Sequence, residues 1–550
     1  MNRNTRKLLA ALTAIGAASV ATAQFYPPPP PAYPGFTNFK LRAADPYMGQ
    51  WDVGLNIRAR LEAKDDAGFT SAGQNRDFSG GRPAGPLNGD RFDNNNTYGV
   101  ARVMPRIGYT DKWYQVFVQG RANVSIDDER GNNGTTFAPP GATPGITAGD
   151  GEQENNYDLS LHQGFIFVGN HKEFPVSAKI GRQELVYGDQ RQVGHFLWNN
   201  NGRSFDAGKV RYQNAFGGVD VFTGSVVYHD NRNFDKSHLD SEQFSGAYFN
   251  LTKLPGITQK QIVETYLYSR NVDRDSLNED WGGVAAPFRQ PYVQDLYTAG
   301  LRVKSKPNAY GNWDYSGELM HQFGTINSRS AVTGATGGTA VTPVSSAAAL
   351  NSAPELDQNA YAAIAQVGYT WSDLAWQPRL SLTYSYASGD KDRSDGTSNT
   401  FQNQFATTHF FYGYMDLNSL QNLHDIRLAL EAKPTPKLRI SAETHFQRLA
   451  STDDYWYNVG GVPRVGGTQA AFVGATGTTA GTGYGINSNN SADLGIEVDL
   501  NFSYSPVPYF NIEGGVSHYF RGDYIKQSWA SAPGSSTDAA YAYLQLTINL

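Results

Sequence analysis

Residues 51–62 read Trp51-Asp-Val-Gly-Leu-Asn-Ile-Arg-Ala-Arg-Leu-Glu62. Odd-numbered positions in this stretch are apolar, whereas even-numbered positions carry glycine or polar residues, among them Arg58 and Arg60. A period of two residues is that of a β-strand, whose successive side chains point to opposite faces. One face of this strand is apolar and the other strongly charged, which is the pattern of a strand placed between lipid and water.

The same alternation recurs along the chain, for example in residues 114–126, 361–371 and 494–504. Aromatic residues gather near the ends of these segments, as in the interfacial girdles of transmembrane barrels. The pattern predicts about 18 strands, an even number as in bacterial outer-membrane barrels. They are expected near 51–62, 97–109, 113–126, 157–168, 175–185, 205–214, 218–229, 243–252, 261–271, 295–305, 312–324, 359–372, 376–388, 423–433, 437–449, 492–505, 508–520 and 539–550.

The connections between these strands alternate in length. Short ones include 110–112, 306–311, 372–375, 434–436 and 506–507, and long ones include 64–96, 325–358, 389–423 and 450–491. A soluble β-sandwich also alternates apolar and polar residues, but it gives no reason for loops that alternate short and long. We therefore predict an all-β fold, a transmembrane antiparallel β-barrel with short periplasmic turns and long extracellular loops.

Composition agrees with this fold class. The 550 residues contain 17% charged residues, below the roughly 25% of soluble domains, yet the mean hydropathy of −0.48 is polar. Glycine (58), tyrosine (32) and phenylalanine (29) replace the missing charge and suit strands and turns. The absence of cysteine excludes a disulfide scaffold and thiol catalysis. A net charge of −6 argues against a nucleic-acid partner.

Two segments precede the predicted barrel of residues 51–550. Residues 1–23 combine Arg3, Arg6 and Lys7 with a short apolar run and the small residues Ala21 and Ala23, which is the pattern of a cleaved signal peptide. Residues 24–50 form a Pro-rich periplasmic segment. Its five consecutive prolines, 27–31, favour an extended polyproline II linker up to residue 45, outside the folded body.

If the apolar phase of the strands faces lipid, the other phase lines a channel. The candidate pore-lining residues are Arg58, Arg60, Arg102, Arg106, Arg121, Lys179, Arg211, Arg302, Arg379, Arg427, Arg439 and Glu443. Fixed positive charge favours the passage of anions, and the guanidinium fork matches carboxylates in particular. A balanced charge network that only keeps the lumen wet and rigid is the alternative interpretation.

Three stretches resemble the alginate export family of outer-membrane proteins. The most specific runs from Gly181 through Tyr187-Gly188 to Tyr212; the others are 51–62 and the loop 388–423. The residues that carry the central motif are Arg182, Glu184, Asp189, Arg191, Trp198, Asn199, Arg203 and Asp206. The resemblance implies an 18-stranded barrel with an arginine-rich pore that passes an anionic uronate polysaccharide. Arg182 and Glu184 fall in the apolar phase of their strand, which a bulge or the strand's end near Gly181 would explain.

The resemblance also defines the expected setting. It implies the outer membrane of a Gram-negative-type envelope, with lipid, lipopolysaccharide, the barrel-assembly machinery and an anionic polysaccharide or sugar-acid cargo as partners. No cofactor is expected. An uptake porin, general or sugar-specific, is the alternative function, and an outer-membrane enzyme or adhesin is a third class. Neither an HExxH nor a GxSxG motif is present. Asp390, Asp392 and Asp395 resemble a calcium loop, but their spacing departs from it, so we expect no metal.

Overall fold

The computed structural model describes residues 35–67, 96–126, 156–170, 172–227, 242–272, 294–327, 330–332, 341–343, 355–461, 464, 484, 486–530 and 538–550. The predicted signal peptide and the five prolines lie outside the described residues. Within them, no α-helix has the length and apolarity needed to cross a bilayer.

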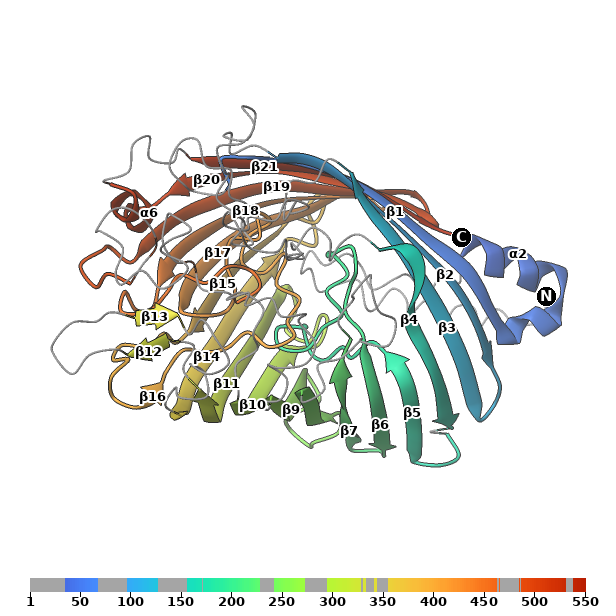
Figure 1. The fold of residues 1–550 in the computed structure, drawn as a ribbon. Helices are drawn as coiled ribbons and strands as arrows, with labels where there is room; N and C mark the ends of the chain where they lie inside the picture. The colour runs from blue at the N-terminus through green and yellow to red at the C-terminus, as the bar shows by residue number, and fades with distance from the viewer. Residues whose placement is uncertain are drawn as a thin grey trace, which may run out of the picture.

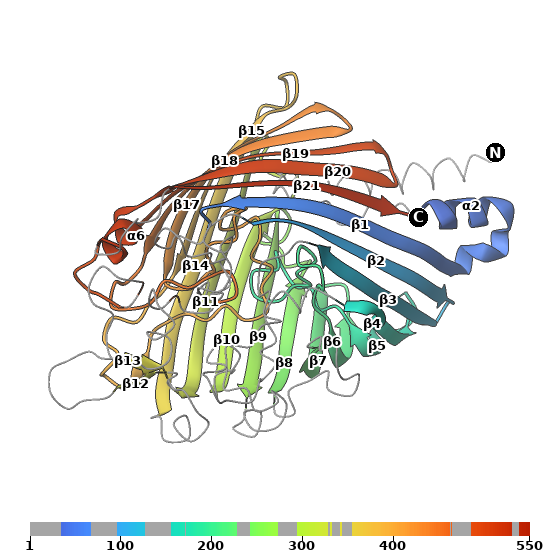
Figure 2. The same cartoon turned by 45° about the horizontal axis from the view of Figure 1, so that its top comes forward.

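The chain folds into one large antiparallel β-barrel (Figures 1 and 2). Among the described residues, eighteen strands make its wall: β1 (Trp51–Asp65), β2 (Asn96–Thr110), β3 (Tyr114–Ile126), β4 (Asn156–Gly169), β5 (Val176–Gln183), β6 (Phe205–Gln213), β7 (Gly217–Val226), β8 (Glu242–Leu251), β9 (Gln261–Val272), β10 (Gln294–Ser305), β11 (Trp313–Asn327), β14 (Glu355–Thr370), β15 (Arg379–Ala387), β17 (Leu423–Thr435), β18 (Leu438–Leu449), β19 (Asp493–Val507), β20 (Phe510–Arg521) and β21 (Ala539–Asn549). Short strands lie in the loops, namely β12 (Ser330–Val332), β13 (Val341–Pro343) and β16 (Thr397–Ser398).

Each wall strand pairs with its sequence neighbours, and β1 pairs with β21 to close the barrel. The closing register runs from Asn56 opposite Asn549 to Asp65 opposite Ala540. The predicted all-β class and number of strands are therefore confirmed. Strand ends differ by a few residues. β15 begins at Arg379, rather than at 376, because Trp376 and Gln377 adopt positive φ angles of 70° and 45° in the preceding turn.

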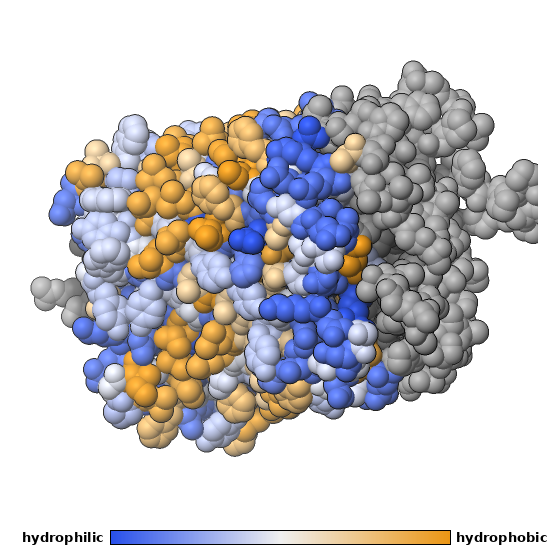
Figure 3. Space-filling model, turned by 90° about the vertical axis from the view of Figure 1, so that its left-hand side faces the viewer, coloured by the Kyte–Doolittle hydropathy of each residue, from blue (hydrophilic) through white to orange (hydrophobic). Residues whose placement is uncertain are grey.

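The two faces of the wall have opposite character. In β17, Ile426, Leu428 and Leu430 are exposed, whereas Asp425 and Arg427 are buried inside. Figure 3 shows the outer face, where hydrophobic side chains form a band with hydrophilic residues beside it. Exposed aromatic residues cluster next to the short turns and form the girdle expected of a membrane barrel: Trp51, Trp113, Tyr114, Phe174, Tyr212, Phe216, Tyr310, Trp313, Trp371, Trp376 and Tyr504.

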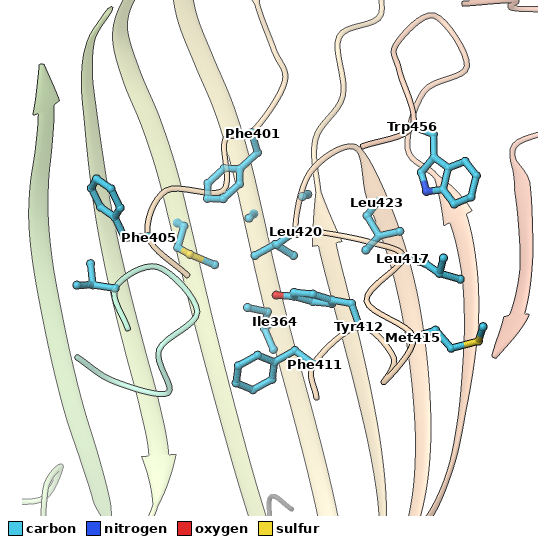
Figure 4. Packing of buried hydrophobic residues seen from close by; sticks show 14 of the residues in the cluster. Ile364, Phe401, Phe405, Phe411, Tyr412, Met415, Leu417, Leu420, Leu423 and Trp456 are labelled. Atoms are coloured by element: carbon cyan, nitrogen blue, oxygen red, sulfur yellow. The ribbon is translucent and has the colours of Figure 1, made fainter. Parts of the chain in front are cut away.

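The hydrophobic core lies inside the barrel, because two of the long loops fold inward. We name them inner loop A, residues 184–204 between β5 and β6, and inner loop B, residues 388–422 between β15 and β17. Buried side chains of these loops, such as Phe401, Phe405, Tyr412 and Leu420, lie against the inner wall (Figure 4). Without such loops a barrel of this size would enclose a wide space that wall side chains cannot fill.

The N-terminal segment differs from the expected extended linker. Helix α2 (Phe36–Ala44) and the 3₁₀-helix η1 (Pro46–Gln50) precede β1 and lie beside its first residues. The Asn38 side chain is buried, donates to Asp52 Oδ1 at 2.7 Å and accepts from the Val53 amide at 2.7 Å. The prediction of an extended linker is thus wrong for residues 36–44, which contain no proline and form a helix. A second short helix, α6 (Asp523–Ser528), follows β20.

Candidate functional site inside the barrel

A group of arginines lies on the inner face of β1, β2 and β3. Arg58 stands directly opposite Arg102 in the register of the first two strands, and Arg60 and Arg121 lie on β1 and β3. All four side chains are buried within the barrel, between 0% and 5% exposed. Like charges directly opposite one another in a sheet are destabilising, so this group needs acceptors that face it. We call these four residues the arginine cluster.

Backbone carbonyl groups of inner loop A supply such acceptors. Arg58 donates to Leu197 O and, at 3.4 Å, to Asn199 O. Arg102 donates to the same two carbonyls at 3.2 and 3.3 Å, and Arg121 donates to Asn201 O. A row of carbonyl oxygens from one loop segment therefore points at the arginine cluster.

Arg60 and inner loop A form a layered stack. Arg60 donates to Trp198 O at 2.8 Å, and its guanidinium lies 3.8 Å from the centre of the Trp198 ring. The Trp198 ring also stacks with the His409 ring of inner loop B, with the ring centres 3.7 Å apart and the planes at 12°. Trp198 also meets Tyr543 of β21 edge-on at 5.2 Å. Trp198 thus connects the arginine cluster, inner loop B and the strand that closes the barrel.

Inner loop A also reaches the opposite wall. Asp189 accepts from Arg302 of β10 at 2.5 and 3.2 Å, and Lys304 lies 3.3 Å from the same carboxylate. Burial raises the pKa of Asp189, but Arg302 and Lys304 lower it more, so it lies well below its usual range. Because β1 and β10 are nine places apart in a ring of eighteen strands, the loop spans the barrel from one side to the other.

The two inner loops are bonded to each other. Val193 forms a parallel β-bridge with Phe405. Arg203 donates to Phe405 O and, at 3.0 Å, to Ala406 O. Arg191 donates to the Tyr412 hydroxyl at 3.2 Å and stacks on Phe411. These two arginines of the sequence motif therefore join loop to loop.

The other motif residues lie near the base of inner loop A. The Arg182 side chain has the same outward phase as Ile180. Strand β5 continues past Arg182 to Gln183 in unbroken register with β6. Arg182 donates to the Asp206 carboxylate of β6 at 2.8 and 2.7 Å. The ion pair, rather than a bulge, accommodates this charge. Glu184 lies 2.9 Å from His162 and 3.3 Å from His195. Burial raises the pKa of Glu184, but the two histidines lower it by more than burial raises it. The pKa of Glu184 therefore lies well below its usual range.

Most remaining pore candidates are in ion pairs on the inner wall. Arg379 pairs with Asp314 and Glu431 at 2.6 and 2.8 Å, and Arg427 pairs with Glu443 at 2.6 Å. Two others lie toward the short-turn end of the barrel and pair over similar distances: Arg106 with Asp52 at 3.0 Å and Arg211 with Asp220 at 2.6 Å.

Two candidates have different surroundings. Lys179 lies 3.6 Å from the centre of the Phe165 ring. Arg439 forms no ion pair with any described residue, although its phase on β18 is that of the buried Ser441 and Glu443.

The three aspartates that resemble a calcium loop do not converge on one point. Asp390, Asp392 and Asp395 accept hydrogen bonds from backbone amides two residues further on, at 2.8–3.1 Å. In the described part of the chain, no group of three or more His, Asp or Glu side chains is placed to hold a metal ion. The aspartates shape turns of inner loop B.

Sequence reasoning missed a group of buried aromatic residues on the inner face of β6–β9, which we call the aromatic wall. Tyr248 stacks with Tyr266 at 5.9 Å and 6°, and Tyr266 stacks with Tyr268 at 4.6 Å. The group comprises Phe205, Phe222, Phe244, Tyr248, Tyr266 and Tyr268. The sequence did contain a signal for this group. Tyr266 and Tyr268 alternate in step with the charged residues Glu264 and Arg270, which places them on the inner face of β9.

Comparison with known proteins agrees with this architecture. Solved structures with a similar fold include Pseudomonas aeruginosa OccK9 (OpdG), at 9% identity and a TM-score of 0.50, covering 91% of this chain and 98% of that one. OccK11 (OpdR) of the same organism has 11% identity and a TM-score of 0.47, covering 91% and 96%. A BenF-like porin from Pseudomonas fluorescens Pf-5 has 10% identity and a TM-score of 0.46, covering 91% and 99%. At such identities the likeness concerns the fold alone.

No curated protein matches the chain. The sequence profile of one family, described as alginate export, matches residues 50–537. This match covers nearly the whole barrel, including the arginine cluster, both inner loops and the aromatic wall. This outer-membrane β-barrel channel therefore belongs to the alginate export family.

Proposed function

We propose that the barrel conducts anionic, uronate-type poly- or oligosaccharides by passive diffusion through its arginine-rich lumen, in export or in either direction. The observation that carries the proposal is the arginine cluster, whose guanidinium groups face a row of carbonyl oxygens of inner loop A. Within the cluster, Arg60 is also paired with Glu62 at 2.7 Å. Oxygen acceptors already occupy the positions at which sugar carboxylates would bind.

Carboxylates compete well for these donors. A hydrogen bond between ionised partners is roughly twice as strong as a bond between neutral ones, and an arginine can hold a carboxylate through two parallel bonds. The loop carbonyls are neutral acceptors, so a passing carboxylate gains more from Arg58 or Arg102 than the loop loses. The carbonyls then return when the cargo leaves, which prevents tight trapping and suits a channel.

A general or sugar-specific uptake porin is the second candidate. The ion pairs of Arg379 with Asp314 and Glu431, and of Arg427 with Glu443, favour it because they neutralise charge on the inner wall. In that case the net selectivity of the lumen would be weak.

Planar-bilayer recording of the purified protein distinguishes the two. The proposal predicts a reversal potential under a salt gradient that reports anion preference, and stronger block by oligouronates than by neutral oligosaccharides of equal length. Cation selectivity, or no conductance at all, would contradict the arginine-lumen mechanism. Equal block by the two sugars would favour the uptake porin.

A matched pair of variants locates the effect. Arg102→Gln removes one charge from the arginine cluster, and Arg182→Gln removes the same charge from the outward phase of β5. We expect only Arg102→Gln to shift the reversal potential toward zero. An equal shift in both variants would show that selectivity does not arise at the cluster.

A further inference from the structure

The first turn of inner loop A inserts an aromatic ring into the aromatic wall. The Tyr187 ring stacks on Tyr248 at 4.6 Å and 26°, and on Phe222 at 5.5 Å and 18°. Its hydroxyl donates to Asp220 Oδ2 at 3.2 Å. Tyr187 is thus a flat ring with an apolar face on aromatic residues and a hydroxyl on a carboxylate.

A carboxylate stands two residues away, on the neighbouring part of the same wall. Asp189 is held by both nitrogens of the Arg302 fork and by Lys304. Arg302 is itself placed by Glu264 of β9, to which it also donates. The wall therefore offers an aromatic surface beside a fixed, preorganised guanidinium group.

A tight turn presents the ring and the carboxylate together. The Gln190 amide donates to Tyr187 O at 2.9 Å, and the intervening Gly188 adopts a φ of +56°. A Cβ atom at Gly188 would lie 3.4 Å from both Arg302 Cδ and the Tyr248 hydroxyl, so the turn lies closely between the two wall residues. This turn therefore holds both Tyr187 and Asp189 against the inner wall.

We propose that Tyr248, Phe222, Arg302 and Lys304 form a binding subsite for one carboxylated sugar unit, and that Tyr187 and Asp189 of inner loop A occupy it as an internal mimic. This inference rests on the proposed function and names a site for its substrate class. It adds Tyr248 and Phe222 to the cationic residues considered above, and it makes the first turn of inner loop A a competitor of the substrate.

The chemistry of a uronate fits the subsite. The C–H groups of a pyranose ring are weakly positive and pack on the negative face of an aromatic ring, as the apolar face of Tyr187 does now. A uronate carboxylate would replace the Asp189 carboxylate on Arg302 and Lys304, with the geometry of a bidentate pair. A neutral sugar could use the aromatic surface but not the cations, so the subsite discriminates by charge.

The test measures half-blocking concentrations of trigalacturonate and of maltotriose on the reconstituted full-length channel. Asp189→Asn removes the charge of the mimic while keeping its shape. A carboxylate that loses such a competitor should bind about tenfold more tightly. Asp206→Asn is the matched control, since it removes a carboxylate from an arginine pair in the outward phase of the wall, between β5 and β6. Trigalacturonate block should change less than twofold in that control.

Two further variants test the subsite from both sides. Arg302→Gln combined with Asp189→Asn should abolish the tenfold gain, and Tyr187→Leu should lower the half-blocking concentrations of both sugars because it frees the aromatic surface. Heat-modifiable migration on gels identifies the variants that fold. Tyr187→Leu keeps the inference testable if Asp189→Asn does not fold.

The outcomes separate the two proposals. If trigalacturonate blocks the wild type more strongly than maltotriose does, but neither Asp189→Asn nor Tyr187→Leu changes the block, the internal mimic is refuted and the proposed function stands. If both sugars block the wild type equally, the proposed function fails and the subsite fails with it. A gain in Asp189→Asn that Arg302→Gln removes supports both.

Discussion

Replacing Trp198 with alanine should release inner loop A from the wall. The ring lies 3.8 Å from the Arg60 guanidinium and stacks with His409 at 3.7 Å. A desolvated cation–π contact contributes up to about 2 kcal/mol, and an aromatic pair about 1 kcal/mol. Because neighbouring contacts are not additive, we take about 2 kcal/mol as the total, which raises the population of the displaced loop about 30-fold.

Hydrogen exchange measures this population directly. The Gly194 amide donates to Phe405 O at 2.9 Å, and the Phe196 amide donates to Thr407 Oγ1 at 3.0 Å. Both bonds join inner loop A to inner loop B and break when inner loop A is released, so peptides covering 194–203 should exchange about 30-fold faster in Trp198→Ala. Trp313→Ala is the control, because Trp313 is exposed on the outer girdle of the barrel.

Exchange within twofold of the wild-type rate would refute the reasoning. It would show that the carbonyl contacts to the arginine cluster hold inner loop A without the stack. Faster exchange that extends into β1 and β2 would also contradict it, since the predicted opening is confined to the loop.

Three other predictions follow from the geometry. Gly413→Ala should lower the temperature of heat-modifiable unfolding far more than Gly256→Ala. Both glycines have positive φ angles, 103° and 76°. A Cβ atom at Gly413 would lie 2.2 Å from Glu497 Oε2, whereas a Cβ atom at Gly256 would meet open space. Burial raises the pKa of Asp390 to about 6 against the opposing charge of Arg393. Its contribution to stability is therefore complete below about pH 4 and is lost as pH rises to about 6. Exchange of residues 388–400, corrected for intrinsic rates, should rise between about pH 4 and 6 and then level off. A pH-independent profile in the wild type, or a rise that persists in Asp390→Asn, would contradict this. Because the chain has no cysteine, an Asn123→Cys/Asn201→Cys pair can be oxidised cleanly; these side chains meet at 2.6 Å, and the oxidised channel should regain its conductance for uronates only after reduction. A conductance that is insensitive to reduction would show that inner loop A does not leave β3 during passage.

The wall of the barrel was predictable from local pattern. The alternation in residues 51–62 places Ile57 and Leu61 outside and Arg58 and Arg60 inside because a strand can orient its residues in only two ways. The turn between β17 and β18 carries Pro436, and Pro434 lies at the register shift just before the turn. These are short-range rules, and the structure follows them.

The interior could not be predicted in the same way. The contacts that place inner loop A join Arg58 to residues 139–142 positions away, and those between the loops join Arg203 to residues about 202 away. No periodicity records such pairs. The motif from Gly181 to Tyr212 contains Arg191 and Arg203, but their role in joining the two loops depends on the closed barrel around them.

The position of Trp198 has a consequence for the order of folding. Its ring contacts Arg60 on β1 and Tyr543 on β21, the two strands that close the barrel by pairing residues 475 to 493 positions apart in the chain. The binding surface for inner loop A therefore does not exist until the ends of the chain have paired. We expect the open sheet to form first and the interior to fill only after closure, so that the docked loop acts as a latch on the completed ring.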